Sequence, residues 1–409
     1  MANPAGAQDG TSAGLRAVRA TESSLDERQR RLRRSLEVLT GGTFTEGNEL
    51  TVLRNGDEIF PAMLGAIRAA RRTVDLMTFV YWTGEIAREF AFTLSDAAER
   101  GVRVRVLVDA IGGRLMDKGL FEMMQHAGVQ LRWFRRPLFN SPLRQNHRGH
   151  RKVLICDETV GFTGGVGIAQ EWCGDARDET QWRDTHVRVA GPAVDGLASA
   201  FVQNWAEVSD ELCDDRDQFP QHEQDGLSVV KVVRGSATLG WDDLQSTFHV
   251  LLDSATERLR IATAYFAPDD FFLDRLCAAA GRNVQVQVLV PGPHADKRLC
   301  QLATESDYGR LADAGVEIWT FQPSMLHTKI ITVDGRAAVI GSSNFNRRSL
   351  DHDEEVVLVV LDGDFTAELD RDYDCDLARS VLIDPERWRD RSMLQRAMEA
   401  ATSPLRRWL

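Results

Sequence analysis

Hydrophobic and polar positions follow two different periods along residues 50 to 380. TVDLMTFVYW and VRVRVLVD are rich in β-branched residues, and in the second of these stretches apolar and charged residues alternate as they do in a strand. Between them, EIAREFAFTLSDAAERG has the spacing of an amphipathic helix that ends at a glycine. Strands that alternate with helices along the chain indicate an α/β fold.

The same order of elements recurs later in the chain. LRIATAYFA, PDDFFLDRLCAAAGRN and VQVQVLVP repeat the strand, helix, strand series, and GVQLRWF is echoed by GVEIWTF. This repetition predicts two α/β units, each with a mixed or largely parallel sheet and helices on its faces. The acidic, glutamine-rich stretch DDRDQFPQHEQDG is typical of a linker. We therefore expect a flexible tail and a basic amphipathic helix in residues 1–47, a first half in 48–213, the linker in 214–226, a second half in 227–380 and a C-terminal helical tail in 381–409.

A basic helix precedes the repeated units. Residues 1–23 are small and polar, and Ser24 with Glu27 has the spacing of a capping box that opens the helix LDERQRRLRRSLEVL before Gly41. Such a helix can lie on an anionic membrane surface or dock a narrow leucine stripe on its own protein, and the sequence leaves both open. The leucines that share one face are Leu25, Leu32, Leu36 and Leu39.

Charge and composition narrow the function classes. The 409 residues carry 61 acidic and 49 basic side chains, a net charge of -12, which argues against general nucleic-acid binding because that requires a positive field. The six cysteines are scattered without a CxxC pair or a metal-like cluster, which indicates reduced thiols. The polar N-terminus has no apolar signal-peptide core and no run reaches 18 apolar residues, so we expect neither a secretion signal nor a transmembrane segment.

Candidate chemistry lies in a second internal repeat. HRKVLICDETVGFTGGVG in the first half aligns without gaps with HTKIITVDGRAAVIGSSN in the second, at a constant offset of 177 residues, whereas His147 has no equivalent lysine and aspartate. Residues i and i+2 of a strand point to one face, so the imidazole and the ammonium of each copy are expected to project toward one pocket. The aligned pairs are His150 and His327, Lys152 and Lys329, Asp157 and Asp334, and Gly164 and Gly341.

This twin motif resembles the signature of the phospholipase D superfamily, a duplicated HxKxxxxD followed by a turn of small residues. LRNGDEIFPAML, YWTGEIAREF, WRDTHVRVAGPAV and NFNRRSLDHDEE look like bacterial cardiolipin synthases in particular, and the resemblance covers roughly residues 48 to 380. The resemblance implies a duplicated phospholipase D-type fold, in which two α/β halves with mixed sheets are flanked by helices and share one active site.

The resemblance also implies roles for the repeated residues. His150 is expected to attack phosphorus, because the first-half histidine is usually the nucleophile in this family, and His327 is expected to protonate the departing alkoxide. Lys152 and Lys329 are expected to hold the non-bridging oxygens of the phosphate. The phosphate cradle is completed by a turn of small residues in the second half, namely Ser342, Ser343 and Asn344.

Five carboxylates belong to the expected site. Asp184 and Glu355, with Glu354 as an alternative, match the family pattern as the residues that orient the histidines. Asp157 and Asp334 are expected to be structural partners within the motif rather than an acid or a base. The residues need no metal ion for this chemistry, and we expect neither a metal nor another cofactor.

Two positions depart from the family pattern. Gly167 stands where the first-half turn usually ends in asparagine, so one donor to the phosphate is missing, and Met77 stands where relatives tend to carry glutamate. Both changes spare the histidines and the lysines. The glycine leaves open a non-catalytic lipid-binding module.

The sequence therefore predicts a phosphatidyltransferase of cardiolipin synthase type, with phosphatidylglycerol as the donor and a phosphohistidine intermediate. Residues 131–156 carry seven Lys and Arg and no acid, with interleaved aromatics, which favours an anionic lipid over a nucleic-acid groove or a solvated loop in so acidic a chain. We expect anionic phospholipid substrates, peripheral contact with the cytoplasmic face of the cell membrane and no nucleic-acid partner. The alternatives are a hydrolytic phospholipase D or phosphodiesterase and, less favoured, a nuclease.

Overall fold

The structure is a computed structural model, and it describes residues 25–136, 147–209, 220–224, 226–236, 243–297, 301, 305 and 307–391. Several expected features lie outside these residues. They are the tail at 1–23, Ser24, part of the linker, positions 137–146 of the basic and aromatic stretch, and the C-terminal tail beyond residue 391.

The first half follows the predicted alternation of strands and helices. The strand predicted at TVDLMTFVYW ends at Thr78, earlier than its apolar run, because the chain leaves the sheet there to enter the candidate site. The elements are β1 (Thr45–Arg54), α3 (Asn55–Ala69), β2 (Thr73–Thr78), α4 (Glu85–Glu99), β3 (Arg103–Asp109), α5 (Lys118–His126), β4 (Gln130–Phe134), β5 (Val153–Cys156), β6 (Val160–Gly164), the short 3-10 helix η1 (Gln170–Trp172), β7 (Thr185–Ala190) and α6 (Ala193–Trp205).

The second half repeats this order with one additional strand and a short helix at its end. Its elements are β8 (Ser228–Gly235), α7 (Asp243–Ser254), β9 (Arg258–Thr263), α8 (Asp270–Gly281), β10 (Gln285–Pro291), α10 (Tyr308–Asp313), β11 (Glu317–Phe321), β12 (Lys329–Val333), β13 (Ala337–Gly341), α11 (Arg347–Asp351), β14 (Glu355–Leu361), α12 (Gly363–Leu377), β15 (Ser380–Leu382) and α13 (Pro385–Arg389).

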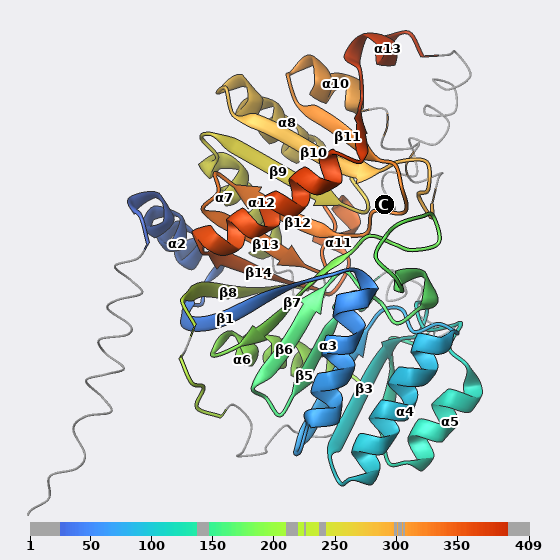
Figure 1. The fold of residues 1–409 in the computed structure, drawn as a ribbon. Coiled ribbons are helices and arrows are strands. Elements are labelled where there is room, and N and C mark those ends of the chain that lie inside the picture. The colour runs from blue at the N-terminus through green and yellow to red at the C-terminus, as the bar shows by residue number, and fades with distance from the viewer. Residues whose placement is uncertain are drawn as a thin grey trace, which may run out of the picture.

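The strands join into one mixed sheet. Within the described residues it has 15 strands in the order β15-β11-β10-β9-β12-β13-β14-β8-β1-β7-β6-β5-β2-β3-β4. β1 and β8 pair antiparallel at its centre, and outward from them the two halves present equivalent strands in the same order. β2, β3 and β4 are parallel, as are β9, β10 and β11. The expected α/β fold with mixed sheets and flanking helices is confirmed (Figure 1).

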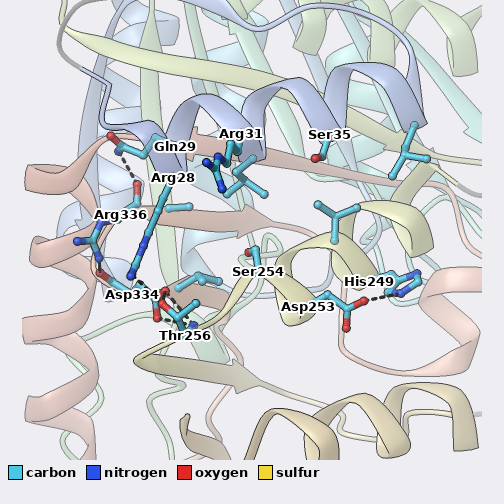
Figure 2. A pocket seen from close by; sticks show the side chains of 15 residues that line it. Arg28, Gln29, Arg31, Ser35, His249, Asp253, Ser254, Thr256, Asp334 and Arg336 are labelled. Carbon is cyan, nitrogen blue, oxygen red and sulfur yellow. Dashed lines mark hydrogen bonds and ion pairs between the residues drawn. The ribbon is translucent and has the colours of Figure 1, made fainter. Parts of the chain in front are cut away.

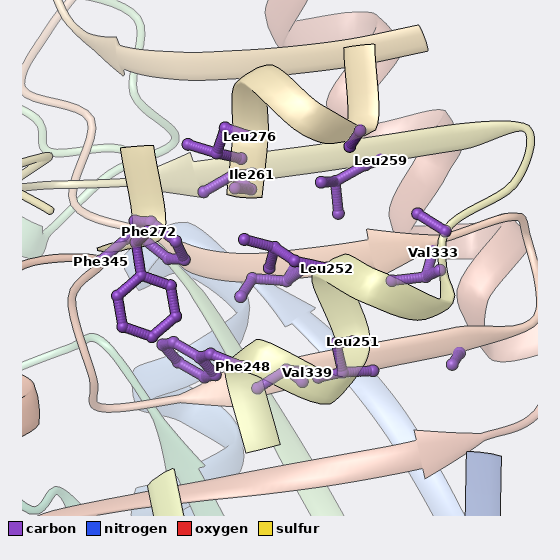
Figure 3. Close-up of a cluster of buried hydrophobic side chains, with 14 of the residues drawn as sticks. Phe248, Leu251, Leu252, Leu259, Ile261, Phe272, Leu276, Val333, Val339 and Phe345 are labelled. Carbon is purple, nitrogen blue, oxygen red and sulfur yellow. The ribbon is translucent and has the colours of Figure 1, made fainter. Parts of the chain in front are cut away.

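Within the described residues, the three larger buried apolar clusters hold the layers together. One lies under α3 and α4 in the first half, and one lies under α2, α7 and α8 in the second. Figure 3 shows part of the latter cluster, where Phe248 and Phe272 pack against Phe345 from two different helices. Phe345 directly follows the turn of small residues, so this core fixes the position of that turn. The third cluster joins both halves and includes α6, α12 and the facing strands.

The basic helix α2 (Glu27–Thr40) docks on the second half. Its N-terminus is capped by Asp26, whose carboxylate accepts from the Gln29 amide at 2.8 Å while Gln29 Oε1 accepts from the Asp26 amide at 2.9 Å. The predicted start at Ser24 was therefore too early. Leu32 and Leu36 are buried against α7, whereas Leu39 is 59% exposed, so the expected leucine stripe is shorter than its spacing indicates.

A groove of about 560 Å³ lies on the outer surface where α2, the C-terminal part of α7 and the turn between β12 and β13 meet. Figure 2 shows Arg28 reaching across it, and Arg28 forms an ion pair with Glu257 at 2.9 Å. Of the two placements that the sequence left open for this helix, the structure has its leucines packed on the protein. Among the described residues, no helix combines the length and the apolar character that crossing a bilayer requires.

Candidate active site

Backbone hydrogen bonds between the halves hold both motif histidines at the N-terminal ends of their strands, β5 and β12. His150 lies just before β5, and its amide donates to the Glu354 carbonyl at 3.0 Å. His327 lies just before β12, and its amide donates to the Arg183 carbonyl at 2.7 Å. Each motif is thereby anchored to the segment of the opposite half that immediately precedes a candidate carboxylate.

The two imidazoles form reciprocal pairs across the halves. His150 Nδ1 lies 2.8 Å from Glu355 Oε1, and His327 Nδ1 lies 2.8 Å from Asp184 Oδ2. Both carboxylates are completely buried. Because a carboxylate can only accept, each Nδ1 carries the hydrogen and each Nε2 presents its lone pair when the ring is neutral. Glu354, the alternative partner, instead forms a 3.0 Å ion pair with Arg151.

Each carboxylate has a second donor, and the two donors differ. The Ser342 hydroxyl donates to Glu355 Oε2. The first-half counterpart of Ser342 is Gly165, where a Cβ would lie 2.3 Å from Asp184 Oδ1, so a serine does not fit. The indole Nε1 of Trp172 donates to Asp184 Oδ2 instead, at 2.9 Å.

Sequence reasoning missed Trp172 because the second half has no matching tryptophan. Glycine at position 165, opposite Ser342 in the aligned motifs, was the available signal that the first-half carboxylate needs another donor.

Aromatic rings lie beside both histidines, one next to His150 and three around His327. The Phe79 ring lies 5.2 Å from the His150 ring, and around His327 the centroids of Trp172 and Trp182 lie at 5.1 and 5.4 Å and that of Tyr265 at 6.5 Å. Their residue types carry no acid-base signal, so the motif analysis did not find them. They remove water from the rings, and low local polarity strengthens each charge interaction in the site.

Burial is the largest cause of the pKa shifts in the site. It lowers the pKa of His150 to about 4, and it lowers the pKa of His327 well below its ordinary value with help from the nearby charges of Lys329 and Lys152. Burial also lowers the pKa of Lys152 to about 8 and that of Lys329 to about 7. The lysine of each half acts on the histidine of the other, so all four groups share one electrostatic environment.

The two orienting carboxyls respond differently to this environment. Burial raises the pKa of Asp184 despite the opposing influence of Lys329 and the Trp172 indole. Burial alone would also raise the pKa of Glu355, but the charge and hydrogen bond of His150, with Lys152 and Ser342, bring it below the ordinary value. Glu355 is therefore the more firmly ionised of the two.

The expected phosphate cradle is only partly free to bind an anion. Lys152 Nζ donates to the His150 carbonyl at 2.9 Å and keeps further hydrogens for a ligand. Ser342 is engaged with Glu355, and the Ser343 hydroxyl donates to the Asn344 carbonyl at 3.2 Å. The Asn344 amide oxygen is buried and accepts no hydrogen bond within the described part of the chain.

Both departures from the family pattern have a packing explanation. At Gly167, which replaces the usual asparagine, a Cβ would lie 2.7 Å from Val80 Cβ, so the surrounding residues exclude a side chain. Met77 is buried in the cluster that joins the two halves, where a glutamate would be an uncompensated charge.

The motif aspartates lie at the opposite ends of their strands from the histidines. Asp157 Oδ1 accepts from the Arg72 amide at 2.7 Å, and Asp334 Oδ1 accepts from the Glu257 amide at 2.8 Å. Both aspartates have positive φ angles, 51° and 53°, as tight turns require. A strand rises about 3.3 Å per residue, so Asp334 lies roughly 16 Å along β12 from Lys329.

Comparisons with known proteins agree with this fold. A family described as cardiolipin synthase, phospholipase D-like domain, matches residues 63–195 and 249–377. Cardiolipin synthase 2 of Bacillus anthracis is 32% identical over 86% of this chain and 69% of its own length. Cardiolipin synthase A of Pseudomonas fluorescens is 31% identical over 85% of this chain and 72% of its own length.

A solved structure has a similar fold. The phosphatidylserine synthase of Haemophilus influenzae Rd KW20 superposes with a TM-score of 0.70 over 92% of this chain and 97% of that chain, at 14% identity. The duplicated α/β architecture with paired histidine motifs is thus that of a phospholipase D-like protein. Within that class, the chain belongs to the cardiolipin synthase family.

Proposed function

We propose that the protein is a phosphatidyltransferase that joins two molecules of phosphatidylglycerol into cardiolipin and releases glycerol. The main support is the reciprocal pairing, in which the carboxylate of each half holds the histidine of the other. This pairing fixes two imidazoles with opposed roles at one site. It is the arrangement that transfer through a covalent intermediate requires.

In the first half-reaction, the bound donor phosphodiester offsets the charges of Lys329 and Lys152, and His327 takes up a proton on Nε2 from solvent. Nε2 of neutral His150 then attacks the donor phosphorus while His327 gives this proton to the departing glycerol oxygen. The phosphorus–oxygen bond breaks, and phosphatidyl-histidine remains. In the second half-reaction, neutral His327 removes the proton from a hydroxyl of the second lipid, whose oxygen attacks phosphorus. The phosphorus–nitrogen bond breaks, and His150 returns to its neutral form.

Four groups support these steps. Lys152 and Lys329 stabilise the non-bridging oxygens as negative charge develops on them. Ser342 and Trp172 act as positioning residues through the carboxylates to which they donate. The low pKa of His150 keeps its ring neutral, and therefore nucleophilic, at neutral pH.

The proposed substrates are anionic phospholipids of the cytoplasmic leaflet, reached by peripheral contact. The net charge of -12 opposes capture of a polynucleotide by the whole molecule. Two buried lysines supply a local positive site instead, which suits a single phosphate group better than an extended backbone.

Product analysis tests this function. Purified protein is incubated with phosphatidylglycerol vesicles, and the lipids are identified by mass spectrometry. Cardiolipin with free glycerol is expected. Phosphatidic acid alone would indicate that water replaces the second lipid, and cleaved oligonucleotide without any lipid product would contradict a lipid enzyme. The variant His150→Ala should bind vesicles and form no product, which separates an enzyme from a binding module.

A further inference from the structure

The turn that follows β3 exposes two large aliphatic side chains next to the candidate active site. Ile111 is 40% exposed and Leu115 is 50% exposed. The turn is well ordered by hydrogen bonds, because Asp109 Oδ1 accepts from the amides of Ile111 at 2.8 Å and Gly112 at 3.1 Å. The exposed side chains therefore project from a rigid backbone.

This turn, residues 110–116, is tied directly to the motif of the first half. Asp109 Oδ2 accepts from the amide of Gly149, the residue before His150, at 3.0 Å. Behind the turn, a Cβ on Gly112 would lie 2.1 Å from the Phe79 carbonyl oxygen, and the Phe79 ring contacts the His150 ring. A single layer of side chains thus separates the exposed turn from the histidine.

Three basic side chains lie near the exposed Ile111 and Leu115. Arg114 lies between them in sequence, Lys118 begins α5, and Arg136 follows β4, which pairs with β3; all three side chains are exposed. Aliphatic tips beside exposed cations match the boundary of an anionic bilayer, where lipid phosphates lie above the acyl chains. A local basic surface is needed for such contact, because a net charge of -12 repels the molecule from anionic lipid.

We propose that residues 110–116 form the membrane-docking surface of this protein, inserting Ile111 and Leu115 among the lipids of an anionic leaflet while Arg114 and Lys118 contact the phosphates. The proposal rests on the proposed function for its purpose, since docking here places His150 next to bilayer lipids. It assigns docking to this turn rather than to α2, whose Leu32 and Leu36 are packed inside the protein.

Vesicle flotation tests the surface. The double variant Ile111→Ser, Leu115→Ser is compared with wild type on phosphatidylglycerol vesicles, and at least a ten-fold weaker partition is expected. Arg114→Gln with Lys118→Gln should weaken binding to the same vesicles and leave binding to phosphatidylcholine vesicles unchanged. The matched control is Val38→Ser, Leu39→Ser on α2, which removes aliphatics that are 77% and 59% exposed and should bind like wild type.

Wild-type binding by the turn variant, or loss of binding by the α2 variant, would overturn the proposal. Turnover of dispersed short-chain phosphatidylglycerol distinguishes docking from damage to the site, because the turn variant should retain it. Loss of that turnover would mean that the turn only supports His150. If wild type floats and the turn variant does not, yet no cardiolipin forms, the docking surface stands and the proposed function fails.

Discussion

At the scale of single residues, the two candidate histidines differ most in what holds their carboxylates. Ser342 donates to Glu355, whereas Trp172 donates to Asp184 in a place where Gly165 leaves no room for a hydroxyl. The tryptophan serves two purposes, because its ring also lies against His327. Replacing it by another aromatic residue separates the hydrogen bond from the packing.

Trp172→Phe should lower kcat about ten-fold, as loss of an outer hydrogen-bond partner commonly does. The indole hydrogen bond lowers the pKa of Asp184, so its removal should raise that pKa. Activity requires the ionised carboxylate, and the acidic limb of the pH–rate profile should therefore move to higher pH. Trp205→Phe, in α6 away from the histidines, should leave the profile in place. An unshifted acidic limb in Trp172→Phe would show that the indole only fills space.

Ligand binding should change the protonation of His327. Apart from burial, the charges of Lys329 and Lys152 lower the pKa of this ring, and a bound phosphodiester would offset them. The pKa should therefore rise in the complex, with proton uptake near neutral pH. Calorimetric titration of His150→Gln with glycerophosphoglycerol, in two buffers of different ionisation enthalpy, measures this uptake. The uptake should fall when His327→Gln is added, leaving the share of Lys329, whose pKa of about 7 the bound anion also raises, and equal uptake with and without His327 would contradict the prediction.

Sequence spacing was sufficient to find the repeated residues but not their contacts. The constant offset between the two motifs singled out His150 and His327, and the family pattern supplied Asp184 and Glu355. The pairing of these residues across the halves depends on how the halves pack, which no local pattern encodes. Trp172 was missed for a different reason: the second half has no matching tryptophan, and its bond to Asp184 joins the ends of an irregular loop within the first half.

At the scale of elements, the apolar periodicity of the sequence predicted the positions of helices and strands well but several of their first and last residues wrongly. α4 and β3 match their predicted segments closely, because apolar periodicity reports the buried face. β2 and β9 stop short of their apolar runs, because the residues beyond them line the site rather than the sheet. The predicted start of α2 at Ser24 was too early, because Asp26 and Gln29 form the capping box and the helix begins at Glu27.

The docking of α2 makes a stability prediction. Leu36 is completely buried in the second-half core, so Leu36→Ala should lower the free energy of unfolding by about 2–5 kcal/mol. Leu39→Ala, three residues further along the helix, should change it by less than about 0.5 kcal/mol because that side chain is mostly exposed. Urea unfolding followed by circular dichroism measures both. Equal effects would mean that α2 is not packed on α7 in solution.

At the scale of the whole molecule, the duplication produces a site that neither half contains alone. The sheet runs through both halves by way of β1 and β8, and a buried cluster joins their facing sides. Residue and partner always come from opposite halves, so the two dyads cannot form until the halves are packed. The near-symmetry of the sheet does not extend to chemistry, because the two carboxylates have different donors and their pKa values shift in opposite directions.

Because each carboxylate holds the histidine of the other half, two similar substitutions should cause two different kinetic defects. Asp184→Asn weakens the proposed acid and base, His327, whereas Glu355→Gln weakens the proposed nucleophile, His150. A p-nitrophenyl phosphodiester needs little proton donation, since nitrophenolate is a stable leaving group. Asp184→Asn should therefore release a rapid burst of nitrophenolate and then stall as the phosphohistidine, because no base activates the second substrate.

Glu355→Gln should show no burst with the same ester, because its defect precedes the covalent intermediate. Stopped-flow absorbance measures the burst, and acid-labile, alkali-stable phosphoryl label on the protein measures the intermediate. Both variants remove one charge from a buried carboxylate, so each serves as the control for the other. A burst in Glu355→Gln and none in Asp184→Asn would reverse the roles of the histidines while preserving the reciprocal pairing. Identical slow kinetics in both would mean that the carboxylates support the fold rather than two separate chemical steps.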